Sequence, residues 1–117
     1  MNDTSGLLPY QIAPAEGILA ALRRYNAALD ASETGTGKTY VAMAVCRELG
    51  YVPLVVCPKS VRSAWTRVAE FMGGSCIPIN YEKLRTGKTP YGRWHEVRAG
   101  TTVFQFNPEE CPPVIIF

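Results

Sequence analysis

A glycine-rich octet, Ser32–Thr39, contains the residues whose types and spacing are best suited to chemistry. Gly35 and Gly37 let the backbone adopt positive φ and approach a ligand closely. Successive backbone N–H groups in such a turn form a concavity for anions, and the dipole of a following helix strengthens it. Lys38 supplies a charge for β- and γ-phosphates, and the Thr39 hydroxyl can bind Mg²⁺. The octet therefore predicts a phosphate-binding P-loop in which Lys38 and Thr39 are the catalytic residues and Thr39 is the metal ligand.

The strict P-loop pattern begins with Gly, and here that position is Ser32. We expect the phosphates and the metal to be held by Thr34, Gly35, Thr36, Gly37, Lys38 and Thr39. The alternative is a glycine-rich turn that only begins a helix. A second Thr-Gly-Lys-Thr stretch, residues 86–89, lacks both a preceding strand and the glycine-rich approach. We interpret that second stretch as a solvated loop.

The elements that would position this octet alternate between helix and strand. Apolar periodicity predicts helices over residues 14–25, 38–49 and 61–72. Gly50 is placed to end the second helix, and Ser60 to cap the third. Short apolar runs predict strands over 27–31, 52–57, 76–79, 101–106 and 114–117, whereas 82–100 is polar and irregular. Such alternation predicts an α/β fold, with a parallel sheet and helices on both of its faces.

The bulk composition limits the class of protein. The 117 residues suffice for one domain or part of one, and 47% of them are apolar. The net charge of +2 excludes a strongly basic nucleic-acid binder, so any such contact requires a local patch. Neither a membrane span nor a secretory signal is predicted. Cys46, Cys57, Cys76 and Cys111 lack zinc-site spacing, which favours free thiols in a cytoplasmic or other intracellular reducing compartment.

The octet, read with its flanks, resembles a known motif. Ala31–Thr39 resembles motif I of superfamily 2 helicases, which tolerates residues other than Gly at its first position. Upstream, Leu7–Gln11 is similar to the Leu-x-x-Tyr-Gln segment of Swi/Snf-type translocases. The resemblance implies that Gln11 selects adenine, since an amide can donate and accept hydrogen bonds at once. It also implies ATP and Mg²⁺ as cofactors.

Downstream, Leu54–Val61 followed by Trp65 resembles motif Ia of the same family. The resemblance implies that Lys59 and Ser60 contact the nucleic-acid backbone, as a cation and a helix start can do. The alternative is that Ser60 only shapes a helix start and Lys59 is solvated. We expect Trp65 to belong to the core. Ile79–Leu84 is similar to an Asn-Tyr-Glu-x-Leu stretch near motif Ib.

Basic and aromatic residues are interleaved over residues 81–98. This mixture suits binding to single strands, although a mobile, solvated loop is an equal alternative. The residues concerned are Lys83, Arg85, Lys88, Arg93, Arg98, Tyr81, Tyr91 and Trp94.

The resemblance runs from about Leu7 to Phe117. It implies that residues 1–117 are the N-terminal portion of the first RecA-like, ATP-binding domain of a helicase, ending just before the Walker B Asp-Glu pair. Glu109 and Glu110 precede the last predicted strand, so we expect this chain to bind ATP without useful hydrolysis. The implied function is ATP-driven translocation on nucleic acid, with duplex DNA favoured, RNA possible and a C-terminal motor lobe as partner. Two alternatives stay open: a non-catalytic nucleotide-binding or interaction module, and a P-loop ATPase outside the helicases.

Overall fold

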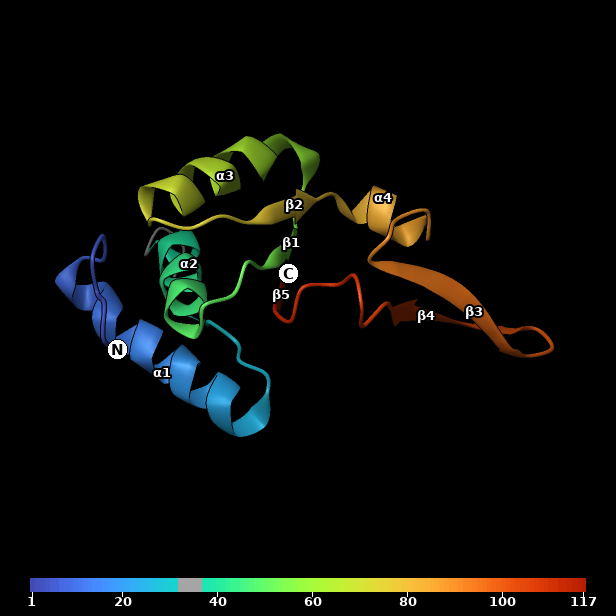
Figure 1. The fold of residues 1–117 in the computed structure, drawn as a ribbon, viewed down its shortest axis with the longest axis horizontal. Coiled ribbons are helices and arrows are strands. Elements are labelled where there is room, and N and C mark those ends of the chain that lie inside the picture. The colour runs from blue at the N-terminus through green and yellow to red at the C-terminus, as the bar shows by residue number, and fades with distance from the viewer. Residues whose placement is uncertain (32–36) are drawn as a thin grey trace.

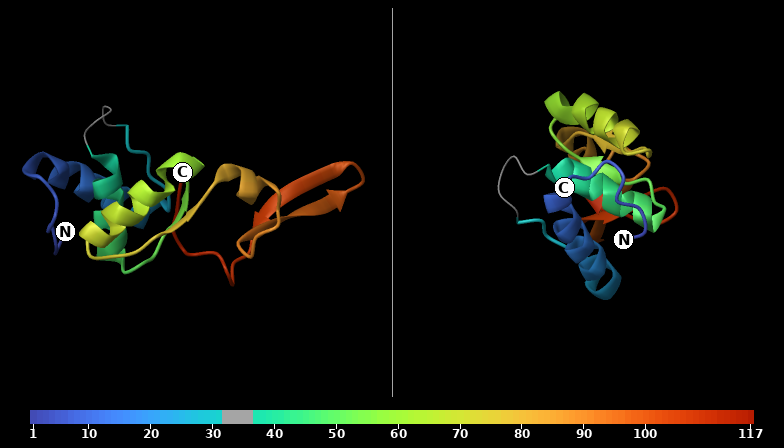
Figure 2. Two further views of the ribbon diagram at one scale, coloured as in Figure 1. Left: turned by 90° about the horizontal axis from the view of Figure 1, so that it is seen from above. Right: turned by 90° about the vertical axis from the view of Figure 1, so that its left-hand side faces the viewer.

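The computed structural model describes residues 1–31 and 37–117 (Figure 1). Its elements in chain order are α1 (Pro9–Tyr25), α2 (Lys38–Leu49), β1 (Leu54–Val56), the 3-10 turn η1 (Lys59–Val61), α3 (Arg62–Phe71), β2 (Ile77–Ile79), α4 (Tyr81–Arg85), β3 (Gly92–Arg98), β4 (Thr101–Phe106) and β5 (Ile115–Ile116). We call α1–α3 with β1, β2 and β5 the body, and the β3–β4 hairpin the arm. The arm extends away from the body (Figures 1 and 2).

The body contains a parallel sheet in the order β2-β1-β5. Leu54 of β1 is paired with Ile77 of β2 and with Ile115 of β5. Leu54 and Val56 face a cluster that also holds Ile79 and Leu84 of α4, and residues at the root of the arm pack against it. The α/β class and the parallel sheet flanked by helices are thus confirmed, while the short helix α4 and the arm cover this face.

Helix α2 lies between α1 and α3 (Figure 2). Its Val41 and Val45 pack against α1, where the buried partners are Ala15 and Leu19. A second set, Met43 and Ala44, packs against Ala69 and Met72 at the other side. Because α2 is apolar on two sides, it is buried along most of its length and fixes the position of its own N-terminus.

Several sequence predictions match these bounds. Helix α2 coincides with residues 38–49, and Gly50 ends it in the left-handed conformation, with φ of 76°. The Gly50 N–H donates to the Arg47 carbonyl at 3.1 Å, as expected for a glycine C-cap. Strands β1, β2, β4 and β5 all lie within predicted strands. Trp65 is half-buried against the α2–α3 cluster, which confirms its place in the core.

The first helix begins at Pro9 and not at Pro14 as predicted. Pro9 occupies the first helical position, where a missing N–H is harmless. The preceding residue, Leu8, is extended, and its N–H donates to Oε1 of Gln11 at 2.8 Å. Pro14 therefore lies inside the helix. The pattern of apolar residues could not reveal this start, because a side-chain hydrogen bond fixes it.

The predicted strand at 27–31 is wrong, because this segment has no regular structure. Leu29 is 88% exposed, and none of Ala27, Ala28 or Ala31 is buried. A strand needs a paired neighbour and a buried face, and three alanine side chains bury little apolar area. The edge strand β5 offers only Ile115–Ile116 as a template.

The polar segment 82–100 is not irregular, since it completes α4 and forms β3. Aromatic contacts explain this difference. Trp94 of β3 is paired with Phe104 of β4, and their rings meet edge to face with centroids 5.4 Å apart. Cross-strand aromatic pairs stabilise a hairpin, and here they do so for one whose first strand is mostly polar. Within the ranges 1–31 and 37–117, no helix is long and apolar enough to cross a membrane.

Candidate nucleotide site and nucleic-acid interface

The described part of the predicted phosphate site is the start of α2. Gly37 is the N-cap residue and has φ of 79°, a left-handed conformation that favours glycine. The first intrahelical bond runs from the Val41 N–H to the Gly37 carbonyl at 3.2 Å. The N–H groups of Lys38, Thr39 and Tyr40 therefore precede the helical ladder and lie at the positive end of the dipole. This arrangement fits a phosphate group.

The Gln11 side chain is brought against this helix start. Only 4% of Gln11 is exposed, and a Cβ placed on Gly37 would collide with Gln11 Nε2. A reciprocal pair of bonds holds Gln11: its Oε1 accepts from the Leu8 N–H at 2.8 Å, and its own N–H donates to the Leu8 carbonyl at 2.9 Å. Sequence reasoning named Gln11 and Gly37 for one site, and the structure places them in contact.

Lys38 is exposed at the first position of α2, and Thr39 is half-buried beside it. The ammonium of Lys38 is thus free to approach a ligand at the helix start. The Thr39 hydroxyl has the chemistry of an Mg²⁺ ligand. The other predicted phosphate contacts, Thr34, Gly35 and Thr36, lie outside the described residues.

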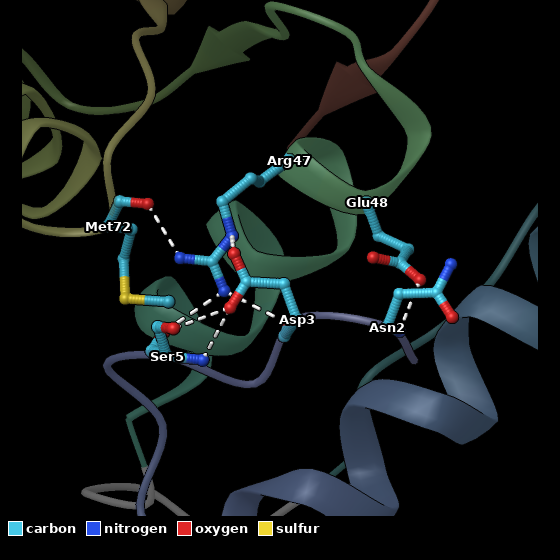
Figure 3. Close-up of polar contacts among 6 residues, drawn as sticks. All are labelled: Asn2, Asp3, Ser5, Arg47, Glu48 and Met72. Carbon is cyan, nitrogen blue, oxygen red and sulfur yellow. Dashed lines mark hydrogen bonds and ion pairs between the residues drawn. The ribbon is translucent and has the colours of Figure 1, made fainter.

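An arginine clamp fixes the segment that leads into Gln11 (Figure 3). Arg47 of α2 donates to the Met72 carbonyl at 2.7 Å and to the carbonyls of Asp3 and Ser5 at 3.1 and 3.0 Å. The Ser5 hydroxyl and N–H both donate to Oδ1 of Asp3, at 2.5 and 2.9 Å. These bonds, with a smaller contribution from Arg47, lower the pKa of the Asp3 carboxyl.

The clamp joins three segments that are distant in sequence, namely the N-terminus, α2 and the end of α3. No motif or periodicity in the sequence predicts this clamp, because Arg47 and Asp3 are 44 residues apart. From the sequence alone, Arg47 is only a positive charge in the last turn of a helix, where it interacts favourably with the helix dipole. Its position shows that α2 organises both its own N-terminus and the approach to Gln11.

Lys59 and Ser60 lie in η1, beyond the carboxyl end of β1, and both are exposed. They are accessible to a nucleic-acid strand. The prediction that Ser60 caps the helix is wrong, because α3 begins at Arg62 with Val61 as its N-cap and without a side-chain cap. The 3-10 turn takes up Ser60 and Val61, so the α-helix begins one residue later than predicted.

The basic and aromatic segment 81–98 divides into structural and exposed residues. Trp94 donates its Nε1–H to the Arg85 carbonyl at 2.7 Å, and the Arg85 guanidinium pairs with Glu82 at 2.6 Å. Arg93 and Arg98 of the arm are exposed. The prediction of a solvated loop at 86–89 holds for Lys88 but is wrong for Thr89, which is only 7% exposed.

Two named proteins are similar to this chain. One, from Acanthamoeba polyphaga mimivirus and provisionally named an ATP-dependent RNA helicase, is 47% identical over 90 residues, covering 75% of this chain and 17% of that protein. The other is a Caenorhabditis elegans homologue of SWI/SNF-related matrix-associated actin-dependent regulator of chromatin subfamily A-like protein 1. It is 40% identical over 63 residues, which cover 52% of this chain and 9% of that protein. No family model and no solved structure matches. The chain is thus related to helicase-like proteins and spans a small part of each.

Proposed function

We propose that this chain is the ATP-binding front part of the first RecA-like domain of a superfamily 2 motor of the Swi/Snf type. The observation that carries the proposal is the contact between Gln11 and Gly37 at the start of α2. An adenine-selective amide is useful only beside the phosphate site, since base and phosphates belong to one ligand. Here the fold brings the two together from positions 26 residues apart.

In this proposal, ATP binds with its phosphates at the start of α2. The Lys38 ammonium neutralises charge on the β- and γ-phosphates, and the Thr39 hydroxyl holds Mg²⁺. Thr34, Gly35, Thr36 and Gly37 contribute backbone N–H groups. Gln11 donates to and accepts from the adenine edge through its side-chain amide. Held there by Thr39, Mg²⁺ would supply charge stabilisation for phosphoryl transfer.

The nucleic-acid track contacts Lys59 and Ser60 at the exposed turn η1. Glu109 and Glu110 lie in the segment before β5, at the amino-terminal end of that strand. Phosphoryl transfer needs carboxylates that hold the metal and orient the water. The chain by itself therefore binds ATP without steady turnover, and translocation belongs to the longer motor.

Calorimetry of ATP–Mg²⁺ binding tests the nucleotide site directly. We expect Lys38→Ala to weaken binding by at least about tenfold, because a charged hydrogen bond contributes roughly 1.5–3 kcal/mol. Lys88→Ala is a matched control, since Lys88 is exposed and lies in the same Thr-Gly-Lys-Thr sequence. Gln11→Ala should reduce the preference for ATP over GTP. Equal binding by Lys38→Ala and the unaltered chain would contradict the site.

The track is proposed to be duplex DNA, and one observation favours RNA instead. The viral relative at 47% identity carries the name of an RNA helicase. Binding of matched DNA and RNA duplexes to the same chain separates these tracks. Tighter binding of the DNA duplex at equal salt supports the first, and tighter binding of RNA replaces it with the second.

A further inference from the structure

The arm is a two-stranded antiparallel ribbon whose two faces differ in their contacts. Residues that lie opposite each other in the ladder share a face, so Trp94 and Phe104 belong to one face. That face anchors the arm, because Trp94 donates to the Arg85 carbonyl of α4 at 2.7 Å and Phe104 packs against the core of the sheet. The second face, which we call the outer face, carries Arg93, His95, Val103 and Gln105.

The outer face has a hollow of about 340 Å³ at the root of the arm. Arg93, His95 and Gln105 line it, and none of its lining residues is acidic. All three side chains are exposed, and within residues 1–31 and 37–117 none of them forms an ion pair or a side-chain hydrogen bond. Glu96, the acidic residue of β3, alternates onto the opposite face. A cation, an imidazole and an amide are therefore available together to a ligand.

The shape of the arm indicates what kind of ligand it can approach. The arm extends away from the body (Figures 1 and 2). Its strand β3 has seven residues and therefore spans roughly 20 Å, and neighbouring strands lie about 5 Å apart. The major groove of B-form DNA is about 12 Å wide and admits a two-stranded β-ribbon. The arm thus has the dimensions to enter this groove with its outer face toward the base pairs.

The side chains of the outer face match the base edges in that groove. An arginine such as Arg93 can donate two hydrogen bonds to O6 and N7 of guanine, and a glutamine such as Gln105 can pair with N6 and N7 of adenine. Val103 is 46% exposed and offers an apolar contact for the methyl group of thymine. Arg98, exposed at the end of β3, supplies a cation for a flanking phosphate. Duplex RNA fits less well, because its major groove is too deep and narrow for side chains to read.

We propose that the arm binds in the major groove of B-form duplex DNA, with Arg93 and Gln105 at the base edges. The proposal rests on the proposed function and adds a second contact with the track. Lys59 and Ser60 lie in η1, whereas Arg93 and Gln105 lie in the arm, so the two contacts can be removed separately.

Fluorescence anisotropy with a labelled DNA duplex of about two helical turns tests the proposal on the full chain. We expect Arg93→Gln to weaken binding by about fivefold or more and Gln105→Ala by about threefold, because each loses hydrogen bonds to a base. Replacing guanine by 7-deazaguanine removes the N7 acceptor. This replacement should weaken binding of the unaltered chain and leave binding of Arg93→Gln unchanged. Methyl green, which occupies the major groove, should compete with the chain, whereas the minor-groove ligand netropsin should not.

Two variants and one ligand serve as matched controls. Arg23→Gln removes an exposed cation from α1, and Thr102→Val removes an exposed hydroxyl from the opposite face of the arm. We expect each to change affinity by less than about twofold. A duplex RNA of the same sequence should bind the unaltered chain and Arg93→Gln equally. All four variants should keep the thermal midpoint of the unaltered chain, because the substituted side chains are exposed.

Failure of this proposal can be distinguished from failure of the proposed function. If Arg93→Gln and Gln105→Ala bind DNA like the controls while Lys59→Gln weakens binding, the arm is not a contact and the proposed function stands. Equal losses on duplex DNA and duplex RNA, or competition by netropsin alone, would overturn the major-groove contact. Absence of any duplex binding, with ATP–Mg²⁺ still bound, would remove both the arm contact and the track while leaving the nucleotide site.

One further outcome concerns another class of partner. If polyglutamate binds the unaltered chain and loses that binding in Arg93→Gln, while duplex DNA binds both equally, the outer face belongs to an acidic protein and the proposal is overturned. Selective loss of DNA binding in Arg93→Gln and Gln105→Ala, with unchanged thermal midpoints and no response to 7-deazaguanine in Arg93→Gln, supports it.

Discussion

The body and the arm are stabilised in different ways. In the body, Leu54 and Val55 have no exposed surface and Met43 has 2%, so the central strand and helix are held by burial. In the arm, every residue of β3 after Gly92 is exposed. An isolated two-stranded hairpin is marginal in water. The arm therefore depends on its root, where Phe104 and Phe106 pack against the core of the sheet.

This difference assigns different roles to the two regions. Gln11, Gly37 and the arginine clamp all belong to the tightly packed body, which suits a site that must hold a ligand in fixed geometry. The exposed side chains Arg93 and Arg98 belong to the arm, where changes disturb little packing. Substitutions should consequently affect stability in the body and surface contacts in the arm.

The largest expected effect on stability distinguishes the body from the arm. Leu54→Ala should lower the free energy of unfolding by about 2–5 kcal/mol, since Leu54 is fully buried in the central strand. Val97→Ala, at a position 61% exposed on the arm, should change it by less than about 0.5 kcal/mol. Urea denaturation measures both. Similar losses for the two variants would mean that the arm is as closely packed as the body.

Alkaline pH should weaken the body through Cys46. Burial, with a smaller contribution from Cys76, raises the pKa of the Cys46 thiol to about 11. Because the folded pKa lies above the unfolded one, the stabilisation is complete below about pH 9 and is lost as pH rises through 11. We expect the free energy of unfolding to fall by roughly 2–3 kcal/mol over this range, as measured by denaturation at several pH values. Cys46→Ala should reduce this pH dependence, and Cys111→Ala, near the arm, should retain most of it.

Alanine substitutions at two glycines should reveal the contact between Gly37 and Gln11 through their different effects on stability. Gly37 and Gly50 flank the same helix with φ of 79° and 76°, but a Cβ on Gly50 would meet nothing within 4 Å. Gly50→Ala should lower the free energy of unfolding by about 1 kcal/mol through backbone strain. Gly37→Ala should lower it by about 1–2 kcal/mol more, because the added Cβ would also collide with Gln11. In a Gln11→Ala background the extra cost should disappear. Persistence of the difference there would show that another group crowds Gly37.

The smallest expected effect concerns the root of the arm. Trp94→Phe keeps an aromatic ring against Phe104 and removes the 2.7 Å bond to the Arg85 carbonyl. We expect a loss of about 0.5–1.5 kcal/mol. Hydrogen exchange should report faster opening of β3 and β4, with unchanged protection in β1. Equal acceleration in β1 would show that the arm and body open together.

The sequence by itself determined the features that depend on local chemistry. Helix α2 was predictable because its apolar period and Gly50 act within a few residues. The short strands of the parallel sheet were predictable because they are continuous apolar runs between breakers. The position of Gly37, Lys38 and Thr39 at the start of α2 was predictable in the same way, since the three residues are adjacent. The duplex preference and the phosphate roles remain predictions.

Only the tertiary structure decided the features that join distant residues. The 27–31 segment has the composition of a strand but pairs with no neighbouring strand. The polar 92–98 segment does pair with one, β4, where Phe104 lies opposite Trp94. Packing also placed Gln11 beside Gly37 and buried the Thr89 hydroxyl. Pairing and burial depend on residues far apart in the chain, and the free energy of such contacts cannot be read from local periodicity.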